Sequence, residues 1–196
     1  VCINGGGFVD YGYGSGIPTG YVIEDGEIRW SDGDIKTARG NIIGMTNDGK
    51  LKLMSNATGQ EALDEGVMDA LEFGPFLIVN GKSLEIHGDP WGRSPRVAIA
   101  QRQDGVVLFL VLNGRTATKP GADMDDLIEI MENYGAYNAA NLDGGTSSVI
   151  VVDNIIVNDP IDSTGAHKTR PISTGFIVTK DESDDSDHSL VADKLK

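Results

Sequence analysis

Residues 123–152 read DMDDLIEIMENYGAYNAANLDGGTSSVIVV, and the fold prediction starts from this stretch. A helix is expected because four apolar residues recur on one face: Met124, Leu127, Ile128 and Met131. Asp123 is placed to cap its first turn, and Gly135 stands where a helix-ending glycine belongs. The later DGG has good turn chemistry and is followed by a strand-like apolar run, so it could simply be the turn of a hairpin.

Four other segments predict hairpins, because each has a turn signal (EDG, NDG, NG or QDG) between two strand-like runs. They are GYVIEDGEIRW (20–30), NIIGMTNDGKLKLM (41–54), FLIVNGKSLEI (76–86) and RVAIAQRQDGVVLFLVL (96–112). Strands joined by tight turns must run antiparallel. A second helix is expected over residues 59–74, where apolar side chains have helical spacing, although Gly66 weakens it. The sequence therefore predicts an α+β fold, with a largely antiparallel, strongly bent sheet and about two helices.

Composition limits the class of protein and its partners. The chain of 196 residues is long enough for one sizeable core, and residues 1–180 are expected to form a single domain. Residues 181–196 are strongly acidic at their start and are expected to be a flexible tail or linker. The net charge of −14 argues against nucleic acid and anionic membrane surfaces as partners. No apolar run approaches the ~20 residues of a membrane-spanning helix.

Cysteine and histidine usage indicates neither a disulfide framework nor a zinc site. Cys2 is the only cysteine, and no Cys/His spacing is typical of zinc ligands. Ser147 and Ser148 lack the nucleophile-elbow pattern, so we expect them to hydrogen-bond a turn or a ligand. Tyr13 and Trp91 lie in expected loops, where they could stack on a sugar ring or cover small cores.

Three arginines lie close to the ends of expected strands. Arg96 opens one strand, Arg115 closes the next, and Arg170 precedes the last. Guanidinium groups match phosphate or carboxylate oxygens, so these side chains could converge on an anion. Alternatively, each is an ordinary surface residue that pairs with one of the thirty acidic residues. The glycine-rich runs NGGGF (4–8) and DGGTSS (143–148) could add backbone N–H donors.

An ordered series of short motifs resembles the phosphodiester glycosidase family over residues 1–180. The motifs are INGGGF, GIPTG, FGPFLIVNGK, PRVAIA, VLNGR, PGADMDDLIEIMENYGAYNAANLDGGTSS, IVNDPID and RPISTGFIV. The resemblance implies cleavage of the sugar C1–O bond of a glycosyl-1-phosphodiester, which releases a sugar such as N-acetylglucosamine from a phosphomonoester. It also implies cell-envelope or exopolysaccharide material as substrate, an extracytoplasmic location, no cofactor, and a family segment that precedes Val1.

The resemblance assigns a role to each candidate residue. Asp143 would be the base or nucleophile at the anomeric carbon, while Arg96, Arg115 and Arg170 would bind the phosphate and stabilise its charge. Because the departing phosphate has a second pKa of about 6, a strong general acid is less necessary than in ordinary glycosidases. The substrate pocket would be formed by Asn4, Gly5, Gly6, Asn141, Gly144, Gly145, Thr146, Ser147, Ser148 and Asp162, the last as a second carboxylate.

Two other interpretations stay open. Val97 and Thr146 stand where the family usually has Thr and Gly, and they leave room for a non-catalytic glycan- or cell-wall-binding module. DMDD and DGGTSS could instead offer oxygen ligands to a divalent cation that assists P–O cleavage. DMDD also matches a helix start, however, and no metal motif is present.

Overall fold

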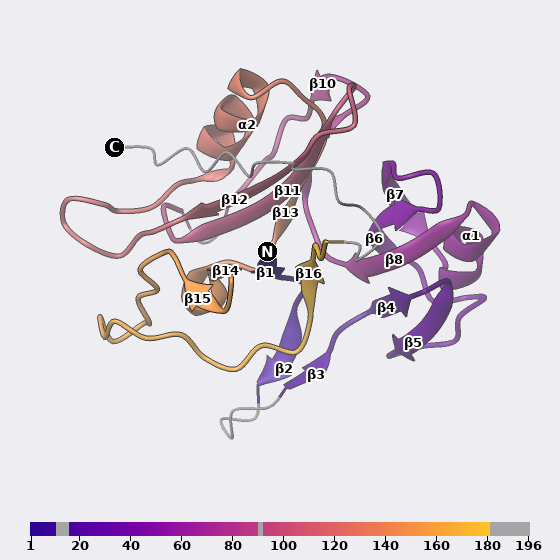
Figure 1. Cartoon of the computed structure of the whole chain (residues 1–196), viewed down its shortest axis with the longest axis horizontal. Helices are drawn as coiled ribbons and strands as arrows, with labels where there is room; N and C mark the ends of the chain where they lie inside the picture. Colours follow the sequence, from indigo (N-terminus) through magenta and orange to yellow (C-terminus); the bar gives the residue numbers. More distant parts are fainter. Residues whose placement is uncertain (11–15, 90–91, 181–196) are drawn as a thin grey trace.

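The computed structural model describes residues 1–10, 16–89 and 92–180. Within them every strand pairing is antiparallel, and the strands form four sheets accompanied by two α-helices (Figure 1). The prediction of a largely antiparallel α+β fold is confirmed. The prediction of one strongly bent sheet is wrong, because local turns define hairpins but not the sheets that the hairpins join.

Several sequence-based expectations lie outside the described residues. They concern Tyr13, Trp91 and the tail at 181–196. In the part of the chain that is described, no helix is both long and apolar enough to cross a membrane.

The first five-stranded sheet has the order β5-β4-β8-β6-β7. Its strands are β4 (Tyr21–Glu24), β5 (Glu27–Ser31), β6 (Gly40–Thr46), β7 (Leu51–Ala57) and β8 (Val67–Glu72). The predicted hairpins β4–β5 and β6–β7 are both present. Asp25 and Gly26 take positive φ angles of 52° and 72°, the geometry that a tight hairpin turn requires.

The prediction of a helix over residues 59–74 is confirmed only for its first part. Thr58 and Glu61 form a capping box at the start of α1 (Gly59–Asp64). Gly66, at φ 78°, then reverses the chain, and residues from Val67 onward form β8. This strand pairs with both β4 and β6, so its apolar residues belong to a central strand of the sheet. Their helical spacing in the sequence could not reveal that position.

The second five-stranded sheet carries the strand that leads into Asp143. Its order is β10-β9-β13-β11-β12, made of β9 (Phe76–Val79), β10 (Lys82–Ser83), β11 (Arg96–Arg102), β12 (Val107–Leu112) and β13 (Ala136–Leu142). Helix α2 (Met124–Asn133) covers one face with the four predicted apolar residues (Figure 1). Asp123 is its N-cap, in a capping box with Asp126, as the sequence predicts.

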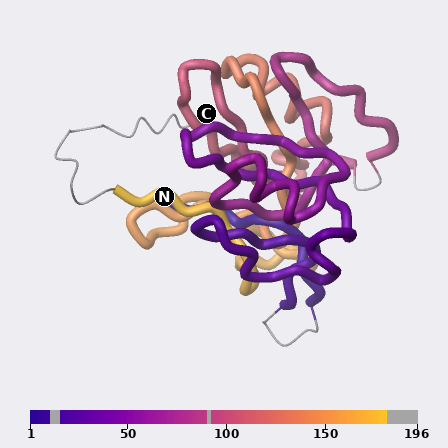
Figure 2. The backbone as a smooth tube through the Cα atoms, turned by 90° about the vertical axis from the view of Figure 1, so that its right-hand side faces the viewer, coloured from indigo at the N-terminus to yellow at the C-terminus, as the bar shows by residue number. Residues whose placement is uncertain are grey.

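Two smaller sheets complete the fold. The order β15-β14-β1-β16 joins β1 (Cys2–Asn4), β14 (Ile150–Val152), β15 (Ile155–Ile156) and β16 (Gly175–Ile177). Strands β2 (Phe8–Asp10) and β3 (Gly16–Pro18) form a separate ribbon. Strand β1 therefore lies between strands from the C-terminal part of the described chain (Figure 2). A shared core that includes Ile3, Leu71 and Val97 connects three of the sheets.

Candidate functional site

Asp143 lies in the loop directly after β13, and Gly145–Ser147 form a short 3-10 turn beyond it. Its backbone N–H donates to the Gly5 carbonyl at 2.9 Å. The Asn4 Nδ2 group donates to the Asp143 carbonyl at 2.5 Å, and Asn4 Oδ1 accepts from the Val149 N–H at 3.0 Å. The last residue of β1 and the glycine that follows it thus fix the backbone of Asp143. Because β13 and β14 belong to different sheets, DGG is not the turn of a hairpin.

The two glycines of this loop are needed for close approach. Gly144 has a negative φ of −111°, but a Cβ there would lie 2.7 Å from the Pro95 carbonyl oxygen and 3.7 Å from Arg96 Cδ. Gly145 has a φ of 61°, and a Cβ there would lie 2.9 Å from Arg115 Nη2. Side chains at these positions would push the loop away from both arginines.

Arg170 makes the densest set of contacts with the loop. Its Nε and Nη2 groups donate to Ser147 Oγ at 3.0 and 2.7 Å, and Ser147 is fully buried. Nη2 also lies 3.5 Å from the Asp143 carboxylate. Nη1 pairs with Asp10 on β2 at 3.1 Å, and the guanidinium lies 4.6 Å from the centre of the Phe8 ring. Arg170 is therefore part of the site that the sequence predicted, but it is shared by two carboxylates.

Arg115 lies three residues beyond the end of β12, on an exposed loop. Its Nη1 group donates to Thr146 Oγ1 at 2.9 Å and to the Ile161 carbonyl at 2.8 Å. Its φ of 66° is uncommon for a residue with a side chain, and such strain often marks a functional position. Among the described residues, no carboxylate forms an ion pair with Arg115.

Arg96 has a different environment from the one expected. It is 4% exposed, and its Nη2 group pairs with Asp89 at 2.6 Å and donates to the Gly92 carbonyl at 2.6 Å. Its Nε group donates to the Ala122 carbonyl at 3.0 Å. The guanidinium is thus held within the protein, while its aliphatic stem borders the space beside Gly144 that a Cβ would enter. Arg115 and Arg170 contact the loop through Thr146 and Ser147, and Arg96 lies beside Gly144.

Burial raises the pKa of the Asp143 carboxyl above its ordinary value, against the opposing effects of a hydrogen bond with Ser147 and the charge of Arg170. About a fifth of its side chain (22%) remains exposed, so the carboxylate can still contact a ligand. A carboxyl with a raised pKa beside arginines is typical of reactive sites, although ion-pair networks also perturb pKa values.

The remaining predicted pocket residues divide into two groups. The N–H groups of Gly5 and Gly6 donate to the Thr174 carbonyl (2.8 Å) and hydroxyl (3.0 Å), so they are not free to bind an anion. Asn141 Oδ1 and Ser148 Oγ are buried without a hydrogen-bond partner, as is Ser173 Oγ. Buried polar atoms are nearly always paired, so these three could take a bound molecule or water.

Asp162 is not placed as a second free carboxylate. Its Oδ1 atom accepts from the Thr164 hydroxyl at 2.6 Å and from the N–H groups of Thr164 and Ala166, while Lys168 lies 3.1 Å from Oδ2. The Thr164 hydrogen bond leads the effects that lower its pKa. Asp162 therefore organises the loop beside Ile161, the residue whose carbonyl holds Arg115.

Sequence reasoning missed the partners of the arginines, namely Phe8, Asp10 and Asp89. The alternation of Phe8 and Asp10 along a strand is the one available signal, and it says nothing about Arg170, which lies 160 residues away from Asp10. Val97, one of the two departures from the family pattern, is fully buried in the core. Thr146, the other departure, contacts Arg115 directly.

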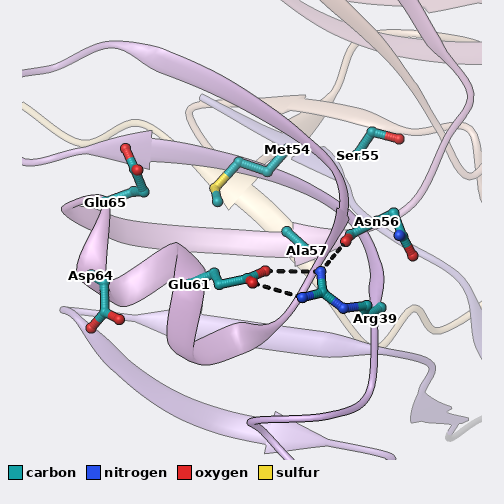
Figure 3. A pocket seen from close by; sticks show the side chains of 8 residues that line it. All are labelled: Arg39, Met54, Ser55, Asn56, Ala57, Glu61, Asp64 and Glu65. Atoms are coloured by element: carbon teal, nitrogen blue, oxygen red, sulfur yellow. Dashed lines mark hydrogen bonds and ion pairs between the residues drawn. The ribbon is translucent and has the colours of Figure 1, made fainter.

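Two surface hollows elsewhere on the protein share no lining residue with this site. One, of about 600 Å³, lies between α1 and β7, where Arg39 pairs with Glu61 at 2.7 Å (Figure 3). The other, of about 800 Å³, includes Ala136 at the opposite end of β13 from Asp143. Within the described ranges, no three His, Cys, Asp or Glu side chains are grouped to hold a metal. Asp123 and Asp126 instead cap α2.

Solved structures share this fold. The catalytic domain of zebrafish N-acetylglucosamine-1-phosphodiester alpha-N-acetylglucosaminidase, auto-inhibited by its pro-peptide, matches with a TM-score of 0.73 and 22% identity, over 92% of this chain and 63% of that chain. A Synechocystis protein matches with a TM-score of 0.58 and 15% identity, over 89% of this chain and 50% of the other. A Burkholderia pseudomallei protein named as exported has a TM-score of 0.58 and 14% identity, over 89% and 64%.

Sequence comparison identifies the family. The SPβ prophage-derived protein YomE of Bacillus subtilis is 28% identical over 119 residues, which are 58% of this chain and 18% of YomE. The chain thus spans less than two thirds of YomE and of the zebrafish structure. Residues 1–179 match the phosphodiester glycosidase family. The chain belongs to the phosphodiester glycosidase family.

Proposed function

We propose that this chain hydrolyses a glycosyl-1-phosphodiester at the sugar C1–O bond, releasing a sugar such as N-acetylglucosamine and a phosphomonoester. The observation that carries the proposal is the 143–147 loop, whose partly exposed Asp143 carboxylate lies 3.5 Å from Arg170 and whose Thr146 hydroxyl accepts a hydrogen bond from Arg115. This arrangement supplies both things that the reaction needs, a negative group for C1 and positive charge for the leaving phosphate.

Arg115 is the best anchor for the phosphate. Its Nη1 group is bonded to Thr146 and Ile161, which leaves Nε and Nη2 to donate to phosphate oxygens. Arg170 contributes the second charge, next to Asp143. As the C1–O bond breaks, its electron pair goes to the phosphate oxygen, and both guanidinium groups stabilise the growing charge. Arg96 acts indirectly, because its guanidinium is bonded to Asp89 while its stem borders Gly144.

Asp143 acts at the anomeric carbon in its ionised form. It either removes a proton from the attacking water or bonds to C1 and is later displaced by water. In both cases the water oxygen ends on the sugar, and the phosphate keeps both bridging oxygens. Asn4 and Ser147 set the position of this carboxylate, the first through the Asp143 carbonyl and the second through Arg170.

The setting of the reaction is also part of the proposal. The proposed substrate material is that of the cell envelope or an exopolysaccharide, and the proposed location is extracytoplasmic; one structural relative is named as exported, which supports the location. A non-catalytic glycan-binding module is the second candidate, motivated by Thr146. Val97, the other departure, is fully buried in the core, so it does not support a changed pocket.

A screen of glycosyl-1-phosphodiesters in 18O-labelled water, with products identified by mass spectrometry, tests the proposal. Label in the released sugar, with C1 exchange controlled, is the expected result. Label in the phosphomonoester would instead indicate P–O cleavage, and saturable binding without turnover would favour the module. Asp143→Asn should abolish turnover in a folded protein. Asp104→Asn, which changes an exposed carboxylate in the β11–β12 turn, is the matched control.

A further inference from the structure

The β2–β3 ribbon places two side chains against Arg170. Side chains alternate along a strand, so Phe8 and Asp10 lie on the same face of β2. Asp10 pairs with Nη1 at 3.1 Å, and the Phe8 ring lies 4.6 Å from the guanidinium carbon. The same guanidinium donates to Ser147 through Nε and Nη2, and its Nη2 group lies 3.5 Å from the Asp143 carboxylate. The ribbon therefore contacts the candidate site through Arg170, the residue that also pairs with Asp143.

The ribbon is shaped to hold Phe8 in this position. Gly16 lies opposite Asp10 on β3, and Pro18 lies opposite Phe8. A Cβ on Gly16 would lie 2.0 Å from Phe8 Cδ2, so the aromatic ring occupies the space that any other residue would fill. Arg170 is thus stacked on a ring whose position depends on a glycine across the ribbon.

Two carboxylates lie close to Arg170, in a site that is proposed to bind phosphate. The two carboxylates of Asp10 and Asp143 share one guanidinium, and Arg115 on the neighbouring loop supplies the second positive charge. A phosphodiester carries one negative charge, whereas a phosphomonoester carries about −1.5 to −2 at pH 7. Repulsion from a fixed carboxylate grows with the charge of the ligand, so Asp10 must disfavour the monoester more than the diester.

We propose that Asp10 is a specificity-determining residue, which makes the site favour a phosphodiester monoanion over a phosphomonoester dianion. The ion pair between Asp10 and Arg170 also weakens the attraction of that guanidinium for a bound anion. The consequence is selection of the diester substrate and faster release of the monoester product. This inference rests on the proposed function, because the two charge states are those of its substrate and product.

Two small probes that differ by one methyl group and one charge test the inference. Dissociation constants for dimethyl phosphate and methyl phosphate would be measured by calorimetry at pH 8, where methyl phosphate is a dianion. Asp10→Asn should tighten methyl phosphate by about tenfold and dimethyl phosphate by about threefold. The ratio of the two constants is the readout, because a purely structural change would move both constants together.

Two further variants serve as comparisons. Asp10→Glu keeps the charge and should keep the wild-type ratio. Glu27→Gln removes an exposed carboxylate that pairs with Arg29 in the β4–β5 hairpin, and it should also leave the ratio unchanged. An unchanged ratio in Asp10→Asn would overturn the inference, as would failure of the wild-type protein to bind either probe.

The outcomes also separate this inference from the proposed function. Hydrolysis of a glycosyl-1-phosphodiester together with an unchanged ratio would reject the role of Asp10 alone. A shifted ratio in a protein that hydrolyses none of the phosphodiesters would reject the proposed function and leave the charge selection in place.

Discussion

Asn4→Ala should destabilise the protein and impair the candidate site at the same time. Asn4 is 1% exposed, and its side chain bonds to the Asp143 carbonyl and to the Val149 N–H. The substitution leaves both backbone groups without this partner. An unsatisfied buried group costs about 1–3 kcal/mol, so the loss of two such bonds should lower the free energy of unfolding by about 2–6 kcal/mol. That is a large part of the about 5–15 kcal/mol typical of a native domain.

Urea denaturation followed by circular dichroism measures this loss. The midpoint should fall while the slope of unfolding free energy against urea stays the same, because the folded state buries nearly the same surface. Under conditions where the variant is fully folded, hydrolysis of a phosphodiester substrate should fall by about tenfold or more. The reason is that a shift of about 1 Å in a reacting group can cost ~100-fold in rate.

Asn41→Ala is the matched control. Asn41 is exposed, and its Oδ1 atom accepts from the Ser55 hydroxyl at 3.2 Å and from the Asn56 N–H at 3.3 Å. Water can replace these bonds, so the loss should be within about 0.5 kcal/mol. If Asn4→Ala cost no more than this control and left hydrolysis unchanged, other contacts would hold the Asp143 loop, and the role given to Asn4 would be wrong.

Substitutions at three other residues in or near the loop should change the stability of the protein in different ways. Arg115→Gly relieves a left-handed conformation that costs about 1 kcal/mol, but it also removes the hydrogen bonds to Thr146 and Ile161. Thermal unfolding should therefore show a stability change of no more than about 2 kcal/mol, while hydrolysis falls at least tenfold. Unchanged hydrolysis would contradict this. Burial raises the pKa of the Asp143 carboxyl, so the folded state binds the carboxyl proton more tightly than the unfolded state does. The contribution of Asp143 to the free energy of unfolding should therefore fall as pH rises above about 4. Urea denaturation from pH 3 to 7 should show that this contribution is absent in Asp143→Asn. The Thr164 hydrogen bond lowers the pKa of the Asp162 carboxyl, so ionised Asp162 stabilises the fold above about pH 4, and this stabilisation is lost progressively as pH falls below that value. Asp162→Asn should therefore be less stable than wild type at pH 7. The difference in the free energy of unfolding should shrink as pH falls.

Turns and helix caps were predictable from the sequence because their causes lie within a few residues. The EDG, NDG, NG and QDG signals each fall at a real hairpin. Asp123 and Gly135 bound α2 as expected, since a cap needs only a side chain and the backbone one turn away. The motif series was also sufficient to identify the family, which the match over residues 1–179 confirms.

The second helix shows where local spacing is insufficient. Val67 and Leu71 are four residues apart, which suits a helix, yet both lie in β8. Pairing with β4 and β6 decides the outcome, and those strands come from earlier parts of the chain. Hydrophobic spacing over a short segment cannot distinguish a helix from a central strand when the neighbours are remote.

The sequence by itself indicated three arginines, a carboxylate on a glycine loop, and the family in which they occur together. Only the tertiary structure decided which of these groups meet. Arg96 is held by Asp89, Asp162 is used by its own loop, and Arg170 is shared by Asp10 and Asp143. The physical reason is distance along the chain: turns and caps form from neighbouring residues, whereas ion pairs between remote segments depend on how the separate sheets pack around their shared core.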